Sequence, residues 1–269
     1  MNPPLRLNRT ERCPWIWAIT LWMACSSLHA SVIYSETFDS SSNTNLSAMG
    51  WKAYGGATAV DISSVAASNT LFVSGAAGNP GPATGYLAAI IGNNSTSNPN
   101  EYTSYATIET GLNLDLTGST ISWTMNASTG ATVRVRLLVQ VNGSWYASNV
   151  SDTSYGYYTP SQYGTGTDFT NAVTSDITKT FTFTTNSSAW SSFTLNSGNS
   201  LSLGSALSQP LESSVITGIG FYIMGGGTGR LDTLEISSVP EPGLVTLMAG
   251  SALFAIVLYR RRKGVKITV

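Results

Sequence analysis

A tyrosine-rich loop is the first place in the sequence where side chains of one kind gather in a pattern that could do chemistry. Its tyrosines, four within nine residues, are Tyr155, Tyr157, Tyr158 and Tyr163. Flat aromatic faces stack on the C–H surfaces of sugars, and neighbouring amides and hydroxyls bond to sugar hydroxyls. Trp145 and Tyr146 lie close by in the sequence and join these tyrosines as candidates for a sugar-binding platform. The alternative interpretation is that these rings cover the edge of a sheet.

Most other reactive side chains are missing from the middle part of the chain, residues 31–239. Both cysteines (Cys13 and Cys25) and the only histidine (His29) lie near the N-terminus. The middle part therefore has no disulfide, no zinc site with histidine ligands and no nucleophile–histidine pair. It holds 12 carboxylates and five cations, a net charge of −7 (5 − 12). So few cations argue against nucleic-acid binding, because phosphate neutralisation requires Lys and Arg.

Carboxylate pairs for glycoside hydrolysis do not occur at a workable spacing. Such a pair must lie about 5 to 9.5 Å apart. Glu101 and Glu109 share one face of a predicted strand, but eight residues of strand separate them by about 26 Å. Asp232 and Glu235 are three residues apart and point to opposite faces of a strand. We therefore assign no catalytic residue and expect that the protein is not an enzyme.

The middle part of the chain has the alternating pattern of β-strands and no long amphipathic helix. Apolar residues alternate with Arg134, Arg136 and Gln140 between positions 133 and 141, and the two arginines are expected on a solvated face. Asn142-Gly143 then predicts a tight hairpin turn, because both residues tolerate a positive φ. The predicted strands span residues 32–38, 58–62, 71–74, 85–91, 103–109, 120–126, 133–141, 144–148, 180–184, 219–223 and 231–236.

These short strands predict an all-β fold, a single β-sandwich over residues 31–238. Gly, Asn and Ser separate the strands, and we find no repeat with a fixed period. The glycine run at 225–229 is expected to form a hairpin turn before the last strand, since no Lys-Ser/Thr follows to make it a phosphate loop. Trp51, Trp123 and Trp190 are expected to pack in the core or at its rim.

Residues 1–30 have the pattern of a secretory signal peptide. Three arginines precede an apolar run at 14–25, which is too short to span a bilayer comfortably, and Ala30 offers a small residue for cleavage. An uncleaved N-terminal anchor is the alternative. In either case we expect the middle part of the chain to be exported.

The C-terminal end, residues 239–263, has three elements in a fixed order. Pro240, Glu241 and Pro242 come first, and an uncharged apolar run at 243–259 follows. A cationic cluster then begins with Arg260, Arg261 and Arg262. The apolar run predicts a transmembrane helix of about 25 Å, and the cations place residues 264–269 in the cytoplasm.

This order resembles the PEP-CTERM sorting signal of Gram-negative bacteria. The resemblance covers only about 25 residues, but every element of the signal is present. It implies that an exosortase, a membrane-embedded enzyme, recognises the tail, and that the precursor is anchored in the inner membrane before it reaches the cell envelope, the surface or the extracellular matrix. The resemblance implies a route and says nothing about the activity of the domain. An ordinary single-pass anchor is the alternative.

The middle part also resembles, more loosely, the jelly-roll modules that include carbohydrate-binding domains. The resemblance is carried by residues 34–39 and 229–236, which look like the first and last strands of such modules. It implies that the two terminal strands lie side by side and that a structural calcium ion is held near Glu36 and Asp232. Asp39 would complete the ligand set, since calcium takes several oxygen ligands. Solvated carboxylates at strand ends are the alternative.

Together these features predict an exported surface or matrix protein with a structural or adhesive role. The alternative is a calcium-stabilised carbohydrate-binding module, and a polysaccharide-active enzyme is a distant third. The expected partners are the exosortase, the membrane through the C-terminal helix before processing, and an extracellular polysaccharide. No cofactor other than calcium is expected.

Overall fold

The computed structural model describes most of the middle part of the chain. The described residues are 30–65, 70–75, 85–92, 102–127, 131–152, 156–159 and 176–238, with 251, 254, 255, 258 and 259. Val32–Ser238 forms one compact unit. The predicted signal peptide, except Ala30, lies outside the described residues. So do Pro240, Glu241, Pro242, the cationic cluster and residues 264–269, and the sorting signal therefore stays a prediction.

Within the described residues, no helix is long and apolar enough to cross a membrane. Of the predicted span 243–259, only five residues are described, and each has helical backbone. They are Ser251, Phe254, Ala255, Leu258 and Tyr259. The transmembrane helix also stays a prediction.

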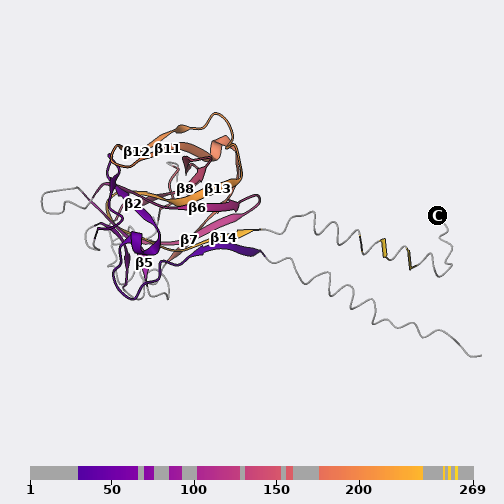
Figure 1. The fold of residues 1–269 in the computed structure, drawn as a ribbon, viewed down its shortest axis with the longest axis horizontal. Helices are drawn as coiled ribbons and strands as arrows, with labels where there is room; N and C mark the ends of the chain where they lie inside the picture. Colours follow the sequence, from indigo (N-terminus) through magenta and orange to yellow (C-terminus); the bar gives the residue numbers. More distant parts are fainter. Residues whose placement is uncertain are drawn as a thin grey trace, which may run out of the picture. The chain divides into compact units, whose positions relative to one another are not determined.

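Two β-sheets make up Val32–Ser238, which confirms the prediction of an all-β, sandwich-like fold (Figure 1). The six-stranded sheet has the order β10 (Ile177–Thr182), β7 (Thr120–Ala127), β14 (Gly227–Ser238), β5 (Tyr86–Ile91), β4 (Leu71–Ser74), and β1 (Ser31–Glu36) also pairs with β14. The eight-stranded sheet has the order β12 (Ser200–Ala206), β11 (Trp190–Asn196), β9 (Ser144–Ser148), β8 (Arg134–Val141), β13 (Val215–Met224), β6 (Ser104–Asp115), β2 (Lys52–Gly55), β3 (Val60–Asp61). Among the described residues, the 3₁₀ helices η1 (Leu46–Met49) and η3 (Ser187–Ala189) join strands.

The chain crosses between the two sheets repeatedly. β5 and β7 belong to the six-stranded sheet, whereas β6 and β8 belong to the eight-stranded sheet. The last two strands, β13 and β14, are divided in the same way. The glycine run between them is therefore a connection between sheets, and the prediction that it forms a hairpin turn was wrong. The Asn142-Gly143 hairpin is confirmed, since both residues have positive φ (49° and 80°) and β8 pairs with β9.

The main core fills the space between the two sheets. Trp51, Trp123 and Trp190 are all buried in it, as predicted. Trp123 of β7 packs edge-on against Phe221 of β13, with 5.6 Å between ring centroids, and so ties one sheet to the other. Aromatic pairs of this geometry add about 0.5–1.5 kcal/mol beyond the burial of their surface.

The eight-stranded sheet curls, so that its other face encloses a second apolar cluster. Phe193 of β11 contacts Tyr222 of β13 at 5.0 Å between centroids, although two strands lie between them in the sheet. Figure 1 shows β11 and β12 above β8 and β13. The ends of the sheet meet through a backbone hydrogen bond, 2.8 Å long, from the N–H of Leu201 to the carbonyl of Ala57. This sheet therefore buries apolar side chains on both faces; we call the face with the second cluster its outer face.

Candidate functional site

The segment 156–159 continues the eight-stranded sheet where β9 ends. Two backbone hydrogen bonds join Tyr158 to Val135 of β8: the N–H of Val135 donates to the Tyr158 carbonyl (2.9 Å), and the N–H of Tyr158 donates to the Val135 carbonyl (2.8 Å). Side chains alternate along an extended segment, so neighbouring residues here point to opposite faces. Tyr158 therefore shares the face of Val135, and Tyr157 shares that of Arg136.

Tyr158 is part of the main core. Its side chain is 4% exposed and its ring packs edge-on against Trp123, with 4.7 Å between centroids. Its hydroxyl donates to the backbone carbonyl of Thr180 at 3.5 Å. Burial raises the pKa of this phenol well above its usual range, and the charge of Asp152 adds to the shift. Tyr158 is therefore a structural residue, and we remove it from the predicted sugar platform.

Tyr157 lies half-buried on the outer face, stacked on an arginine. The guanidinium carbon of Arg136 lies 4.1 Å from the centre of the Tyr157 ring. Arg136 is buried, and its Nη1 donates to the carbonyl of Ser148 (2.5 Å) and to Oδ1 of Asn149 (2.9 Å). We expected Arg136 on a solvated face, and that expectation was wrong because the ring covers it. Arg134, two residues earlier, is exposed as expected, and its guanidinium carbon lies 5.9 Å from the same ring centre.

Gly156 allows the tyrosine ring to lie over the arginine. It has a φ of +74°, and a Cβ at this position would lie 2.9 Å from Nη2 of Arg136. Any other residue would be strained in this conformation and would crowd the guanidinium. The Gly-Tyr-Tyr sequence thus places the Tyr157 ring on the outer face of the eight-stranded sheet and the Tyr158 ring on its core face.

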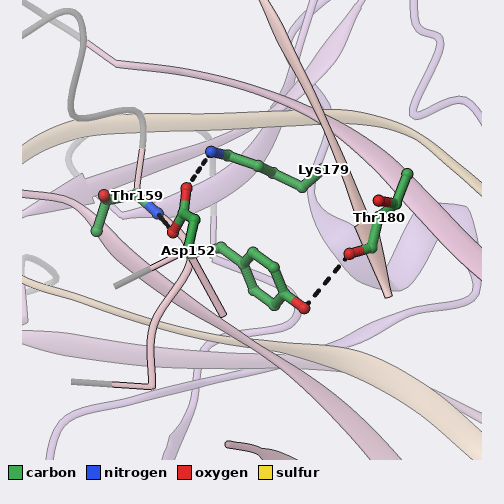
Figure 2. Close-up of polar contacts among 5 residues, drawn as sticks. Asp152, Thr159, Lys179 and Thr180 are labelled. Atoms are coloured by element: carbon green, nitrogen blue, oxygen red, sulfur yellow. Dashed lines mark hydrogen bonds and ion pairs between the residues drawn. The ribbon is translucent and has the colours of Figure 1, made fainter. Parts of the chain in front are cut away.

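An ion pair attaches the same loop to the six-stranded sheet (Figure 2). Lys179 of β10 lies opposite Trp123 in the strand register, is 9% exposed, and pairs with Oδ2 of Asp152. The other oxygen of Asp152 accepts a hydrogen bond from the N–H of Thr159 at 3.2 Å. Figure 2 shows Asp152 between these two partners. The loop is therefore held on both sides of Tyr157 and Tyr158.

The remaining residues of the predicted platform do not gather around Tyr157. Trp145 is 8% exposed and belongs to the second apolar cluster on the outer face, where it packs over Gly218. Tyr146 packs against the main core on the opposite face of the sheet. Tyr155 and Tyr163 lie outside the described residues. Of the six predicted aromatic residues, Tyr157 is the one that the structure places, half-buried, on the outer face.

The terminal strands lie side by side as the jelly-roll resemblance implied, since β1 pairs with β14. Glu36, at the end of β1, is engaged by nitrogen donors. One of its oxygens accepts from the N–H of Phe38 (2.7 Å), and the other accepts from the indole N–H of Trp51 (3.2 Å). Glu36 thus braces the turn after β1.

Asp232 is a buried carboxylate in the middle of β14. It is 2% exposed and its Oδ1 accepts from the N–H of Thr233 at 2.7 Å, where a bulge interrupts the pairing with β7. The pKa of Asp232 is raised to about 7, chiefly by burial and to a lesser extent by the charges of Asp39 and Asp176, against the lowering effect of the Thr233 hydrogen bonds. Across the described ranges, no group of three His, Cys, Asp or Glu side chains is arranged to hold a metal ion. The calcium site stays a prediction, with Glu36, Asp39 and Asp232 as its candidate ligands.

Comparisons with known proteins give no family. No family model matches the chain, and no curated protein matches it. Among solved structures, the chain is similar to the K1 cleaved adhesin domain of Lys-gingipain from Porphyromonas gingivalis W83 (13% identity, 77% of this chain and 98% of that chain, TM-score 0.35). It is also similar to an exo-beta-agarase (12%, 64% and 23%, TM-score 0.35) and to a carbohydrate-binding module specific for non-crystalline cellulose (11%, 71% and 87%, TM-score 0.29). These TM-scores are too low to support a fold assignment, which therefore depends on the strand pairings described above.

The burial of Asp232 predicts a stability that falls as the pH rises. The pKa of an unfolded aspartate is about 3.9, so between that value and about 7 the unfolded chain loses its proton more readily than the folded chain. The contribution of the protonated Asp232 to the free energy of unfolding is therefore complete below pH 4. It decreases as the pH rises to about 7 and does not change further above that pH. Asp232→Asn should remove this dependence and raise the free energy of unfolding at pH 8, relative to pH 5, by on the order of 2 kcal/mol.

The measurement is chemical denaturation of the wild type and of Asp232→Asn at pH 5 and pH 8, with a chelator present. The difference between the two proteins cancels the effect of other titrating groups. An identical pH dependence in both proteins would show that Asp232 titrates normally in the folded state.

Proposed function

We propose that this protein is an exported surface protein with an adhesive role, and that it binds polysaccharide through Tyr157 on the outer face of the eight-stranded sheet. The observation that carries the proposal is the half-buried Tyr157 ring, stacked on the buried guanidinium of Arg136. A sugar ring would stack on the side of the phenol that faces away from Arg136.

The setting of this ring supports a binding role. Its backbone is joined to β8, and the loop behind it is held by Asp152 and Lys179, so the ring loses little freedom when a ligand binds. Aromatic side chains on rigid elements, flanked by a few polar groups, are typical of sugar sites. Arg134 supplies such a group beside the ring.

The route to the surface is proposed from the sequence. The signal-peptide pattern of residues 1–30 and the PEP-CTERM-like tail at 239–263 support export, anchoring of a precursor in the inner membrane, and recognition by an exosortase. The finer fold assignment, a jelly roll, is supported by the crossing of consecutive strands between the sheets and by the pairing of β1 with β14. We propose no catalytic activity; an enzyme would release reducing ends from the bound polysaccharide.

Removal of the Tyr157 ring should abolish binding without unfolding the protein. The test is the migration of the full chain in native gels that contain a neutral glucan, a neutral galactan or a polyuronate, in a detergent without a sugar head group. We expect at least one polysaccharide to retard the wild type. Tyr157→Ala should remove the retardation, because the sugar ring loses the aromatic face on which it stacks. The main core is not changed by this substitution.

Two variants control this experiment. Tyr157→Phe keeps the ring and should keep the retardation. Tyr158→Ala removes a core side chain, and should lower the free energy of unfolding by about 3–5 kcal/mol. No retardation of the wild type by any polymer, or full retardation of Tyr157→Ala, would contradict the proposal.

Calcium is the second, lesser proposal for this domain. Asp39 and Asp232 repel each other when both are charged, and a hard cation between them would relieve that repulsion. If calcium binds there, excess calcium should raise the melting temperature of the full chain above its value in a chelator, and Asp232→Asn should abolish the increase. An equal melting temperature in calcium and in chelator would reject the calcium site.

A further inference from the structure

The exposed arginine beside Tyr157, Arg134, indicates which class of sugar the site would bind. We propose that the site at Tyr157 binds sugars that carry a negative charge, with Arg134 as the residue that selects the anion. This inference rests on the proposed function, because it names the class of polysaccharide that the same site would take.

Cations are scarce in this domain, and two of them lie near one ring. The five cations of residues 31–239 are Lys52, Arg134, Arg136, Lys179 and Arg230, against 12 carboxylates. Arg134 and Arg136 are two residues apart on β8 and share its outer face, about 6.6 Å from each other along the strand. In a domain with a net charge of −7, attraction of an anionic sugar must come from such a local group and not from the overall field.

The two arginines have different tasks. Arg136 is buried, bonded to the Ser148 carbonyl and to Asn149, and covered by the Tyr157 ring. Its guanidinium supports the ring from below. Arg134 is exposed, and its guanidinium carbon lies 5.9 Å from the ring centre, against 4.1 Å for that of Arg136. A sugar ring laid on Tyr157 would bring a substituent at its rim within reach of Arg134.

Guanidinium chemistry fits an acidic substituent at that rim. Its planar fork of N–H donors matches the oxygens of a carboxylate or a sulfate ester, and hydrogen bonds between charged groups are about twice as strong as neutral ones. Across the sheet, Met224 lies opposite Arg134 in the register and offers an apolar contact beside the charge.

The test compares one sugar with and without its charge. Calorimetric titration of the full chain uses an oligogalacturonate and its methyl ester, which has the same ring and no negative charge. The wild type should bind the acid about tenfold or more tightly than the ester. In Arg134→Gln the affinities for the acid and the ester should become similar, whereas Tyr157→Ala should lose binding of both.

Lys52→Gln is the matched control. Lys52 is an exposed cation on the same face of the sheet, three strands from β8 and thus about 14 Å across it. The change in net charge equals that of Arg134→Gln, so an unaltered preference for the acid in this variant assigns the effect to Arg134. Melting temperatures of all variants confirm that each is folded.

A second arm separates the two kinds of anion. It compares a sulfated galactan oligosaccharide with its desulfated parent in the same proteins. A preference for the charged form in either arm supports the proposal, and the arm that shows it identifies the group as carboxylate or sulfate. Equal affinity for charged and neutral forms in both arms, or a preference that survives Arg134→Gln, overturns it.

The outcome also distinguishes this inference from the proposed function. If a neutral polysaccharide retards the chain through Tyr157 and no charged sugar is preferred, the sugar site stands and its anion selectivity falls. If neither neutral nor charged sugars bind, both fall together.

Discussion

The alternation of side chains along β8 is the constraint on which the rest of this domain depends. Val135, Leu137 and Val139 point into the main core, where they help to hold the eight-stranded sheet against the six-stranded one. The residues between them must then point to the other face. That face carries Leu138, which is buried in the second cluster, and the two arginines of the candidate site. A single strand therefore contributes to the main core, the second cluster and the site.

Side chains alternate in the same way along the segment 156–159, because two backbone hydrogen bonds pair Tyr158 with Val135. Because Tyr158 is fixed in the core against Trp123, Tyr157 must lie on the outer face, above Arg136. The Lys179–Asp152 pair reinforces this position from the six-stranded sheet. Lys179 is nearly buried whereas Asp152 is exposed, so the pair adds little net stability and serves mainly to hold the loop. The burial of Tyr158 in the core and the ion pair thus order the loop and position the Tyr157 ring on the outer face.

Much of the fold could be predicted from residue patterns. The strands at 71–74 and 144–148 coincide with β4 and β9, and the Asn142-Gly143 turn is where the sequence placed it. The sequence analysis missed β2, β11 and β12, which are short or rich in small polar residues and pair with neighbouring strands. The curl of the eight-stranded sheet, which buries Trp145, depends on contacts between distant strands that no local pattern records.

The candidate site was predicted only in part, for the same reason. The sequence indicated a cluster of aromatic rings, but alternation places Tyr157 and Tyr158 on opposite faces, and it does the same to Trp145 and Tyr146. The role of Arg136 could not be inferred, because its stacking partner lies about twenty residues away in a loop. Glu36 and Asp232 do fall on neighbouring strands, yet Glu36 is bonded to Phe38 and Trp51. Sequence patterns identified which residues were unusual, and the strand register decided which of them meet.

The central claim is that the ligand surface lies on the outer face of the eight-stranded sheet, at Tyr157. The most direct test is an NMR titration of the full chain with an oligogalacturonate, observing the arginine Nε–H signals. Substitution of Arg134, Arg136 and Arg230 by Lys, one at a time, assigns the three arginines of the domain. The account predicts that the signals of Arg134 and Arg136 shift, while that of Arg230, on the six-stranded sheet, stays unchanged. A shift of Arg230 with no change at Arg134 and Arg136 would contradict it.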